Sequence, residues 1–127
     1  MKNVVVEAEI VKEVDGVYIV GTPDILTDDS VIDIKTTSQS VSKPRDEHVV
    51  QVNVYMWMTN RKKGYLVYII RNENIRIFEV EYDEKLIELF LHHAKKLAEC
   101  FTKKQAPKPE YGWRCARCQY WERCGIA

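Results

Sequence analysis

Apolar and polar residues alternate with a period of two through the first part of the chain, which predicts strands. Residues 3–12 follow this pattern, and Asp15-Gly16 has the composition of a two-residue hairpin turn, so residues 17–26 are expected to return as a second strand. Pro23 has no amide hydrogen to donate to a neighbouring strand. It must therefore lie at an edge, at a bulge or at the end of the second strand.

A third strand and a helix are predicted next. After a polar turn, residues 31–36 form a third short strand, and residues 37–45, rich in Ser, Lys and Pro, are expected to form a mobile loop. Asp46 is a candidate cap for a helix that runs to about Thr59. This helix has many β-branched residues, but the next strand pattern begins only after the polar break that follows it.

A second hairpin and a second helix complete the regular part of the chain. Residues 65–71 and 75–82 alternate again and are separated by three residues typical of a turn. Asp83 then caps a helix that runs to about Lys104 and stops before two prolines. The expected apolar stripe of this helix consists of Leu86, Phe90, Leu97 and Phe101.

The order of these elements, β-β-β-α-β-β-α, predicts a mixed β-sheet with helices packed on it, in the α/β or α+β class. The length of 127 residues suits one hydrophobic core. We expect residues 1–105 to form this core domain. Residues 106–127 are short, aromatic and rich in cysteine, and we expect them to form a tail packed on the core.

The composition, 46% hydrophobic and 30% charged, is that of a globular protein and excludes disordered and fibrous chains. No uncharged apolar run approaches membrane-spanning length, and the first residues lack the features of a signal peptide, so we expect a soluble, cytoplasmic protein. The net charge is zero, but residues 1–83 carry −4 and residues 84–127 carry +4. The basic end is either a contact for phosphate or the solvated face of a lysine-rich helix.

Two acids and a lysine are the strongest candidates for chemistry. On a strand, Asp33 and Lys35 share a face, while Ile32 and Ile34 are expected to point into the core. Asp24 on the preceding strand adds a second carboxylate. A structural ion pair explains Asp33 and Lys35 equally well when they are considered alone.

These residue types fit metal-assisted cleavage of a phosphodiester. Such a reaction needs a cation that neutralises charge on the phosphate, and an activated water. Mg²⁺ or Mn²⁺ prefers oxygen ligands, so Asp24, Asp33 and the Ile34 carbonyl are the predicted metal ligands. Lys35 would orient the water or help to deprotonate it.

The segments Gly21-Thr22-Pro23-Asp24 and Asp33-Ile34-Lys35, with eight residues between the two acids, resemble the core of the PD-(D/E)xK nuclease superfamily. The resemblance implies a restriction-endonuclease-like sheet and a metal-dependent DNA nuclease. Downstream, Gln51-Val52-Asn53-Val54-Tyr55 resembles the Q-x-x-x-Y motif of the RecB-like branch, in which this helix touches substrate or metal-bound water. Gln51 and Tyr55 are one helical turn apart. His48 lies on the same face and is a candidate substrate contact, although a surface histidine is the simpler interpretation.

Three of the four cysteines, Cys115, Cys118 and Cys124, fall in one short window. In a reducing compartment this spacing indicates a metal site, either zinc with one more ligand or an iron–sulfur cluster. The tail resembles that of RecB-like and CRISPR-associated exonucleases, in which three such cysteines and an earlier fourth bind a [4Fe–4S] cluster. Here no cysteine precedes the core, so Cys100 is the favoured fourth ligand. A residue outside this chain, or no fourth ligand, are the alternatives.

Three functions remain in competition. The first is an exonuclease-like deoxyribonuclease in DNA repair, viral DNA processing or CRISPR adaptation. The second is a non-catalytic nucleic-acid-binding subunit that keeps the fold. The third is a zinc-stabilised structural module in which the acids only pair with Lys35. The family's N-terminal helical region is not recognisable here, so we expect a homodimer or a partner protein to replace it.

Overall fold

The structure is a computed structural model that describes residues 3–72, 74–110 and 112–124. The chain divides into two compact units, Met1–Ala94 and Lys95–Ala127. The first unit contains the sheet and the first helix, and the second contains the cysteine-rich segment. Each unit is described by itself below.

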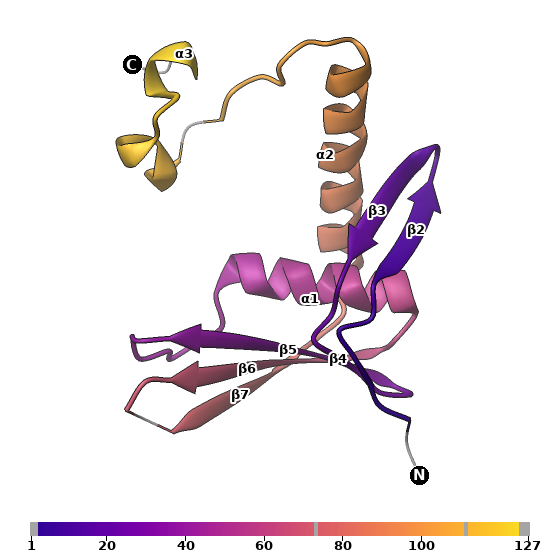
Figure 1. Cartoon of the computed structure of the whole chain (residues 1–127), viewed down its shortest axis with the longest axis vertical. Helices are drawn as coiled ribbons and strands as arrows, with labels where there is room; N and C mark the ends of the chain where they lie inside the picture. The colour runs from indigo at the N-terminus through magenta and orange to yellow at the C-terminus, as the bar shows by residue number, and fades with distance from the viewer. Residues whose placement is uncertain (1–2, 73, 111, 125–127) are drawn as a thin grey trace. The chain divides into compact units, whose positions relative to one another are not determined.

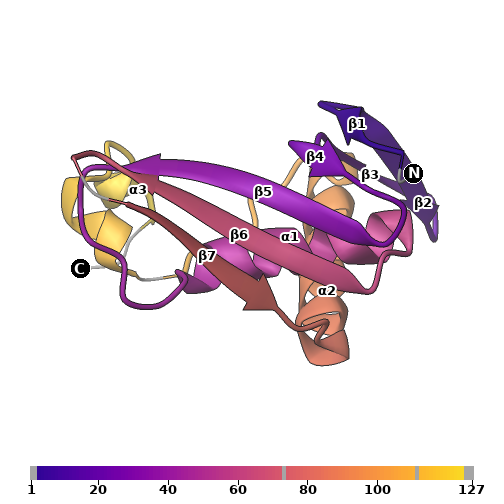
Figure 2. The same cartoon turned by 90° about the horizontal axis from the view of Figure 1, so that it is seen from below.

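A five-stranded mixed sheet is the centre of the first unit (Figures 1 and 2). The strands β5 and β6 are parallel, and the other neighbours are antiparallel. Parallel neighbours need a crossover connection, and the helix α1 (Asp46–Thr59) provides it. The predicted mixed α/β fold is confirmed. The strand order is β1 (Val5–Val6), β4 (Ile25–Leu26), β5 (Ser30–Thr37), β6 (Lys63–Ile70) and β7 (Ile75–Val80).

The predicted first hairpin exists but is broken in the middle of both arms. Its far half is a separate two-stranded sheet of β2 (Ile10–Val14) and β3 (Val17–Gly21), closed by the predicted turn with positive φ at Asp15 and Gly16. Its near half, β1 and β4, joins the main sheet. The prediction of continuous strands over 3–12 and 17–26 is therefore wrong. The first is interrupted at Glu7, which adopts a left-handed φ of 53°. The second is interrupted around Pro23, which cannot donate a backbone hydrogen bond.

The helix α1 covers one face of the sheet, and the core lies between them (Figure 2). Gly64 on β6 makes this close approach feasible, because a Cβ there would lie 2.6 Å from Val52 Cγ1. The predicted cap at Asp46 is wrong by one residue, because Arg45 is the N-cap. The Arg45 side chain makes no capping hydrogen bond to the helix. The segment before α1 is a loop after Thr37, as predicted, and it contributes one side chain, Val41, to the core. The buried members of the core are Leu26, Val31, Val41, Val52, Met56, Leu66, Tyr68, Ile70 and Val80.

The second helix, α2 (Glu84–Thr102), begins with the predicted cap, because Asp83 Oδ1 accepts the Lys85 amide at 3.0 Å. Its apolar stripe differs from the prediction. The residues that pack against Ile19, Val54 and Met58 are Ile87, Phe90, Leu91 and Ala94. Leu97 and Phe101, which we expected in the stripe, belong to the second unit and are 59% and 86% exposed.

The second unit continues with a 3₁₀ helix, η1 (Trp113–Arg117), and a short helix, α3 (Trp121–Cys124). None of the helices within the described residues has the length and apolar content needed to cross a membrane.

The two faces of β5 differ in burial, and the alternation of side chains along the strand does not tell which face is the buried one. Asp33 points to the α1 side and is only 3% exposed, whereas Ile34 on the opposite face is 37% exposed. The expectation that Ile34 points into the core is wrong. The core lies on the acid's side of the strand, so a carboxylate is buried where an apolar residue would usually be.

Candidate functional site

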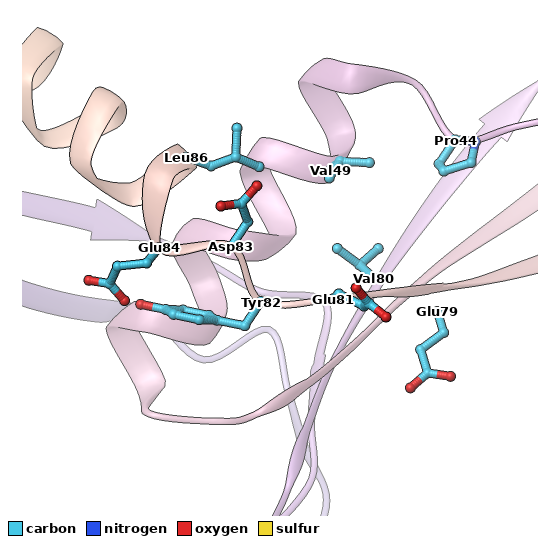
Figure 3. Close-up of a pocket in the computed structure, with 9 residues that line it drawn as sticks. All are labelled: Pro44, Val49, Glu79, Val80, Glu81, Tyr82, Asp83, Glu84 and Leu86. Atoms are coloured by element: carbon cyan, nitrogen blue, oxygen red, sulfur yellow. The ribbon is translucent and has the colours of Figure 1, made fainter.

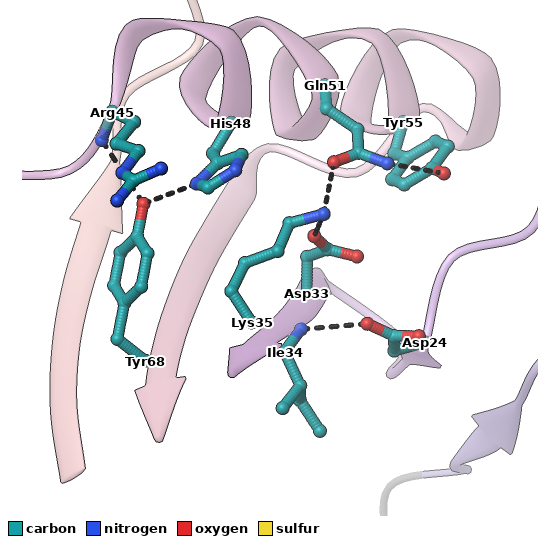
Figure 4. A network of polar contacts seen from close by, with 9 residues as sticks. All are labelled: Asp24, Asp33, Ile34, Lys35, Arg45, His48, Gln51, Tyr55 and Tyr68. Carbon is teal, nitrogen blue, oxygen red and sulfur yellow. Dashed lines mark hydrogen bonds and ion pairs between the residues drawn. The ribbon is translucent and has the colours of Figure 1, made fainter. Parts of the chain in front are cut away.

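Asp24 reaches β5 because strand pairing is interrupted around Pro23, between the end of β3 at Gly21 and the start of β4 at Ile25. Within the described residues β4 pairs with only Val31 and Ile32 of β5, so the edge of β5 is uncovered from Asp33 onward. Asp24 lies directly before β4, and its Oδ2 accepts the Ile34 amide hydrogen at 2.8 Å (Figure 4). The corner in the first hairpin thus brings the two acidic motifs together.

The same contact orients the Ile34 carbonyl. In an extended strand the N–H and C=O of one residue point to the same side. Since the Ile34 N–H faces Asp24, its carbonyl oxygen faces the same uncovered edge. The three oxygen donors predicted from the sequence, two carboxylates and this carbonyl, are therefore grouped at one edge of β5.

Asp33 is a buried acid with incomplete pairing. Lys35 Nζ lies 2.9 Å from Oδ2, an ion-pair distance, but among the described residues Oδ2 accepts no hydrogen bond. Burial raises the pKa of Asp33, and the neighbouring Asp24 carboxyl raises it further, while Lys35 lowers it. Burial and the second acid outweigh the lysine.

The lysine is held between the acid and the helix. Lys35 Nζ donates a hydrogen bond of 2.6 Å to Gln51 Oε1, and Gln51 Nε2 donates in turn to the Tyr55 hydroxyl at 3.1 Å (Figure 4). The expectation that Gln51 and Tyr55 share a helix face is confirmed. Because the amide accepts from Lys35 with one end and donates to Tyr55 with the other, it fixes the position of the ammonium.

A second set of contacts lies at the start of α1. His48 Nδ1 is 2.7 Å from the hydroxyl of Tyr68 on β6, and the same hydroxyl accepts the Arg45 amide hydrogen at 3.1 Å. Sequence reasoning did not select Tyr68, because an aromatic residue in a strand is typical of a core. The available signal was positional, since β6 runs parallel to β5 and Tyr68 is the register partner of Lys35.

The carboxylate edge fits a divalent cation. An acid oxygen that is buried without a hydrogen bond is costly unless another group interacts with it. Lys35 supplies part of that interaction at Asp33 Oδ2, 2.9 Å away, and Asp33, Asp24 and the Ile34 carbonyl together offer the oxygen atoms that Mg²⁺ or Mn²⁺ prefers. Within the described residues no group of three His, Cys, Asp or Glu side chains is close enough to bind a metal, so two carboxylates are the side-chain contribution.

The hollows of the surface differ in charge. One, of about 460 Å³, lies at the junction of β7 and α2 and is lined by the acids Glu79, Glu81, Asp83 and Glu84 (Figure 3). This charge repels phosphate. Another, of about 380 Å³, lies at the carboxyl ends of β5 and β6, and its Thr36 shares the face of the exposed Ile34, opposite Asp33 and Lys35. Its lining residues are Thr36, Thr37, Ser38, Ile69 and Arg71.

The cysteines are not assembled into a site. Cys100 is near the end of α2, Cys115 is in η1, and Cys124 ends α3, and none of the four described cysteines forms a disulfide. The Gly112 amide donates to Cys115 Sγ, and the Tyr120 amide donates to Cys118 Sγ, each at 3.4 Å. Amide donors of this kind stabilise thiolates that bind metals or iron–sulfur clusters.

A family model described as the PD-(D/E)XK nuclease superfamily matches residues 1–125. Among curated proteins, the CRISPR-associated exonuclease Cas4 of Saccharolobus solfataricus is 35% identical over 88 residues, which are 69% of this chain and 40% of that protein.

Solved structures give a similar result. The crystal structure of SSO0001 has a TM-score of 0.67 and 27% identity, covering 97% of this chain and 60% of that one. An alkaline exonuclease from Laribacter hongkongensis has a TM-score of 0.51 and 23% identity, covering 76% of this chain and 62% of that one, and shows likeness of fold. The chain thus spans about 40 to 62% of the length of these relatives.

Proposed function

Since the chain belongs to the PD-(D/E)XK nuclease superfamily, we propose that it is an exonuclease-like DNA nuclease that depends on Mg²⁺ or Mn²⁺. The observation that carries this proposal is the grouping of Asp24, Asp33 and the Ile34 backbone at the uncovered edge of β5, with the Lys35 ammonium beside Asp33. A purely structural ion pair does not account for it. Such a pair explains Asp33 and Lys35, but not why a second acid, Asp24, bonds to the same strand at Ile34.

Each residue has a defined role in the proposed reaction. Asp24, Asp33 and the Ile34 carbonyl would hold the cation, which when bound supplies positive charge against the phosphate and an acidified water. Lys35 places its ammonium beside Asp33 and orients the attacking water. Gln51 keeps the ammonium in position by accepting one of its hydrogens, and Tyr55 holds the Gln51 amide from the other end.

The substrate strand is proposed to run along β5. His48 lies in the first turn of α1 and is our candidate contact for a phosphate oxygen near the reacting one. At the carboxyl end of β5, the hollow with Thr36, Thr37, Ser38 and Arg71 would offer hydroxyl groups and a guanidinium to a phosphate where the DNA strand passes the end of the sheet. The acidic hollow at β7 and α2 is unsuited to DNA because its charge is the same as that of phosphate.

The cysteine-rich tail is proposed to bind a [4Fe–4S] cluster through Cys115, Cys118 and Cys124, with Cys100 as the fourth ligand. The amide donors to two of the sulfur atoms support this proposal. Residues 106–127 would then be a cluster-binding tail on a nuclease core of residues 1–105. A reducing cytoplasm would keep these cysteines available as ligands. Zinc at the same cysteines is the alternative, and iron and zinc analysis with a visible absorption spectrum after anaerobic purification separates the two.

The test of the nuclease is cleavage of end-labelled single- and double-stranded DNA with Mn²⁺, for the parent and for Asp33→Ala and Lys35→Ala. We expect the parent to release nucleotides and both variants to lose this activity. Equal cleavage by the variants contradicts the site. The DNA substrate that is cleaved best would then help to choose among the proposed processes, which are DNA repair, viral DNA processing and CRISPR adaptation.

A non-catalytic DNA-binding subunit is the second candidate. The observation that favours it is the ion pair between Lys35 Nζ and Asp33 Oδ2 at 2.9 Å, which already compensates the buried acid. In that case a second copy or a partner protein would supply the cleavage. DNA affinity without metal-dependent cleavage, and restored cleavage on adding the partner, would support this function.

A further inference from the structure

Tyr68 is held rigidly beside the catalytic lysine. Its Cα on β6 is the register partner of Lys35 on β5, and its side chain is 1% exposed. Its ring packs edge-on against Phe78 of β7, with centroids 5.7 Å apart. From this position the hydroxyl meets the first turn of α1 at the Arg45 amide and at His48 Nδ1 (Figure 4).

The donor in each of these two contacts follows from the atoms involved. The Arg45 amide has only a hydrogen to offer, so the Tyr68 oxygen accepts it. The hydroxyl has one hydrogen of its own, and among the described residues His48 Nδ1 is its sole acceptor. A buried hydroxyl hydrogen without an acceptor is costly, so Tyr68 donates to Nδ1.

This direction defines the state of the histidine. An imidazole that accepts at Nδ1 is neutral and carries its hydrogen on Nε2. Burial, and after it the Lys35 ammonium, lower the pKa of His48, in agreement with a neutral ring. Figure 4 shows the ring lying between the Tyr68 hydroxyl and the Lys35 side chain, so its second nitrogen is on the side of the active site.

We infer that Tyr68 is a positioning residue of the active site, which fixes His48 as the neutral Nε2–H tautomer so that this hydrogen is donated to a substrate phosphate oxygen. The inference rests on the proposed function for its substrate. A neutral donor beside Lys35 contributes a directional hydrogen bond without adding a second positive charge. Tyr68 also anchors the start of α1 through Arg45, whose carbonyl accepts the first amides of the helix.

The tautomer is tested directly by ¹⁵N NMR of protein labelled at histidine. We expect His48 of the parent to show a protonated Nε2 and an unprotonated, hydrogen-bonded Nδ1. In Tyr68→Phe the hydroxyl is lost and the ring is kept, so the signals should move toward a mixture of tautomers. Tyr65→Phe on the same strand is the matched control and should leave His48 unchanged. An Nδ1–H tautomer in the parent, or identical His48 signals in Tyr68→Phe, overturns the inference even if the protein cleaves no DNA.

Cleavage kinetics separate this role from simple anchoring of the helix. Tyr68→Phe should lower kcat about tenfold, the value of one hydrogen bond to the ring. His48→Gln keeps an N–H donor near the Nε2 position without a ring nitrogen that Tyr68 must orient. In that background Tyr68→Phe should change kcat less than about twofold. A tenfold loss in both backgrounds would assign the effect to the Arg45 anchor and overturn the inference, whereas an inactive parent would contradict only the proposed nuclease.

Discussion

The Asp24 carboxylate accepts the amide hydrogen of Ile34 at 2.8 Å, so the acid of the first motif is bonded to the backbone of the second. This bond holds the corner of the broken hairpin against the uncovered edge of β5. It also keeps the Asp24 carboxyl near that of Asp33, whose pKa burial raises first and Asp24 raises further. The eight residues between the two acids form β4, a turn and the start of β5, and the antiparallel pairing of Ile25 with Ile32 returns Asp33 to a position opposite Asp24.

Asp33→Asn should separate activity from stability. The raised pKa of Asp33 means that the fold favours the uncharged form, since a group with a raised pKa binds its proton more tightly in the folded state. An amide imitates that form. We expect cleavage with Mn²⁺ to fall more than about 100-fold while the melting temperature at neutral pH stays the same or rises. Calorimetry and the DNA assay on the same samples check this, and a marked loss of stability would contradict it.

Gln51→Leu should disturb the lysine more than Tyr55→Phe does. Gln51 accepts from Lys35 Nζ at 2.6 Å, whereas Tyr55 acts only through Gln51 at 3.1 Å. We expect kcat to fall about 10- to 100-fold for Gln51→Leu, and about fivefold or less for Tyr55→Phe. Single-turnover cleavage rates measure both. An equal loss for the two variants would mean that the contacts do not act in this order.

Arg71→Ala should weaken binding of DNA and leave the chemistry intact. Its guanidinium lines the hollow beyond Lys35, away from the two acids. We expect KM to rise several-fold with kcat unchanged, and the slope of log K against log salt to shrink by about 1. Lys62→Ala is the control, because this exposed cation lies just before β6, near the opposite end of that strand. If Lys62→Ala has the same effect, the hollow has no special role.

Gly64→Ala should destabilise the first unit. The added Cβ would lie 2.6 Å from Val52 Cγ1 and 2.9 Å from Met56 Sδ, so α1 must move away from β6. We expect a loss of about 1–3 kcal/mol in the free energy of unfolding. Urea denaturation measures it. Gly112→Ala is the control and should be neutral, because a Cβ there meets nothing within 4 Å.

The sequence predicts the types of the elements well and their interruptions poorly. Helix α1 and the second hairpin have strong periodic patterns, and they lie within a residue or two of the expected bounds. The break of the first hairpin depends on Glu7, whose left-handed φ has no signature in an acidic residue of a strand pattern. Pro23 was a usable signal, but it did not tell which of its three outcomes would occur.

The candidate site could be predicted only in part from the sequence, for the same reason. Asp24, Asp33 and Lys35 were predicted from their residue types and spacing, and Gln51 and Tyr55 from a motif resemblance, but no pattern in the chain reveals that Asp33 is buried and Ile34 exposed. Tyr68 is brought to the site by the register of two parallel strands, β5 and β6, in which Lys35 and its partner Tyr68 are 33 residues apart in the sequence. Non-local pairing of this kind is set by packing against α1, which a local pattern does not contain.

The crossover that makes β5 and β6 parallel also determines when the centre forms during folding. The two acids are close in sequence, but Lys35 gains Gln51 only when α1 docks, and Tyr68 arrives only when the distant β6 pairs with β5. Closing such a long connection is entropically unfavourable until the strands and helix pack together. The centre therefore assembles together with the sheet, and a newly made or partly unfolded chain carries the acids without the arrangement that would cut DNA.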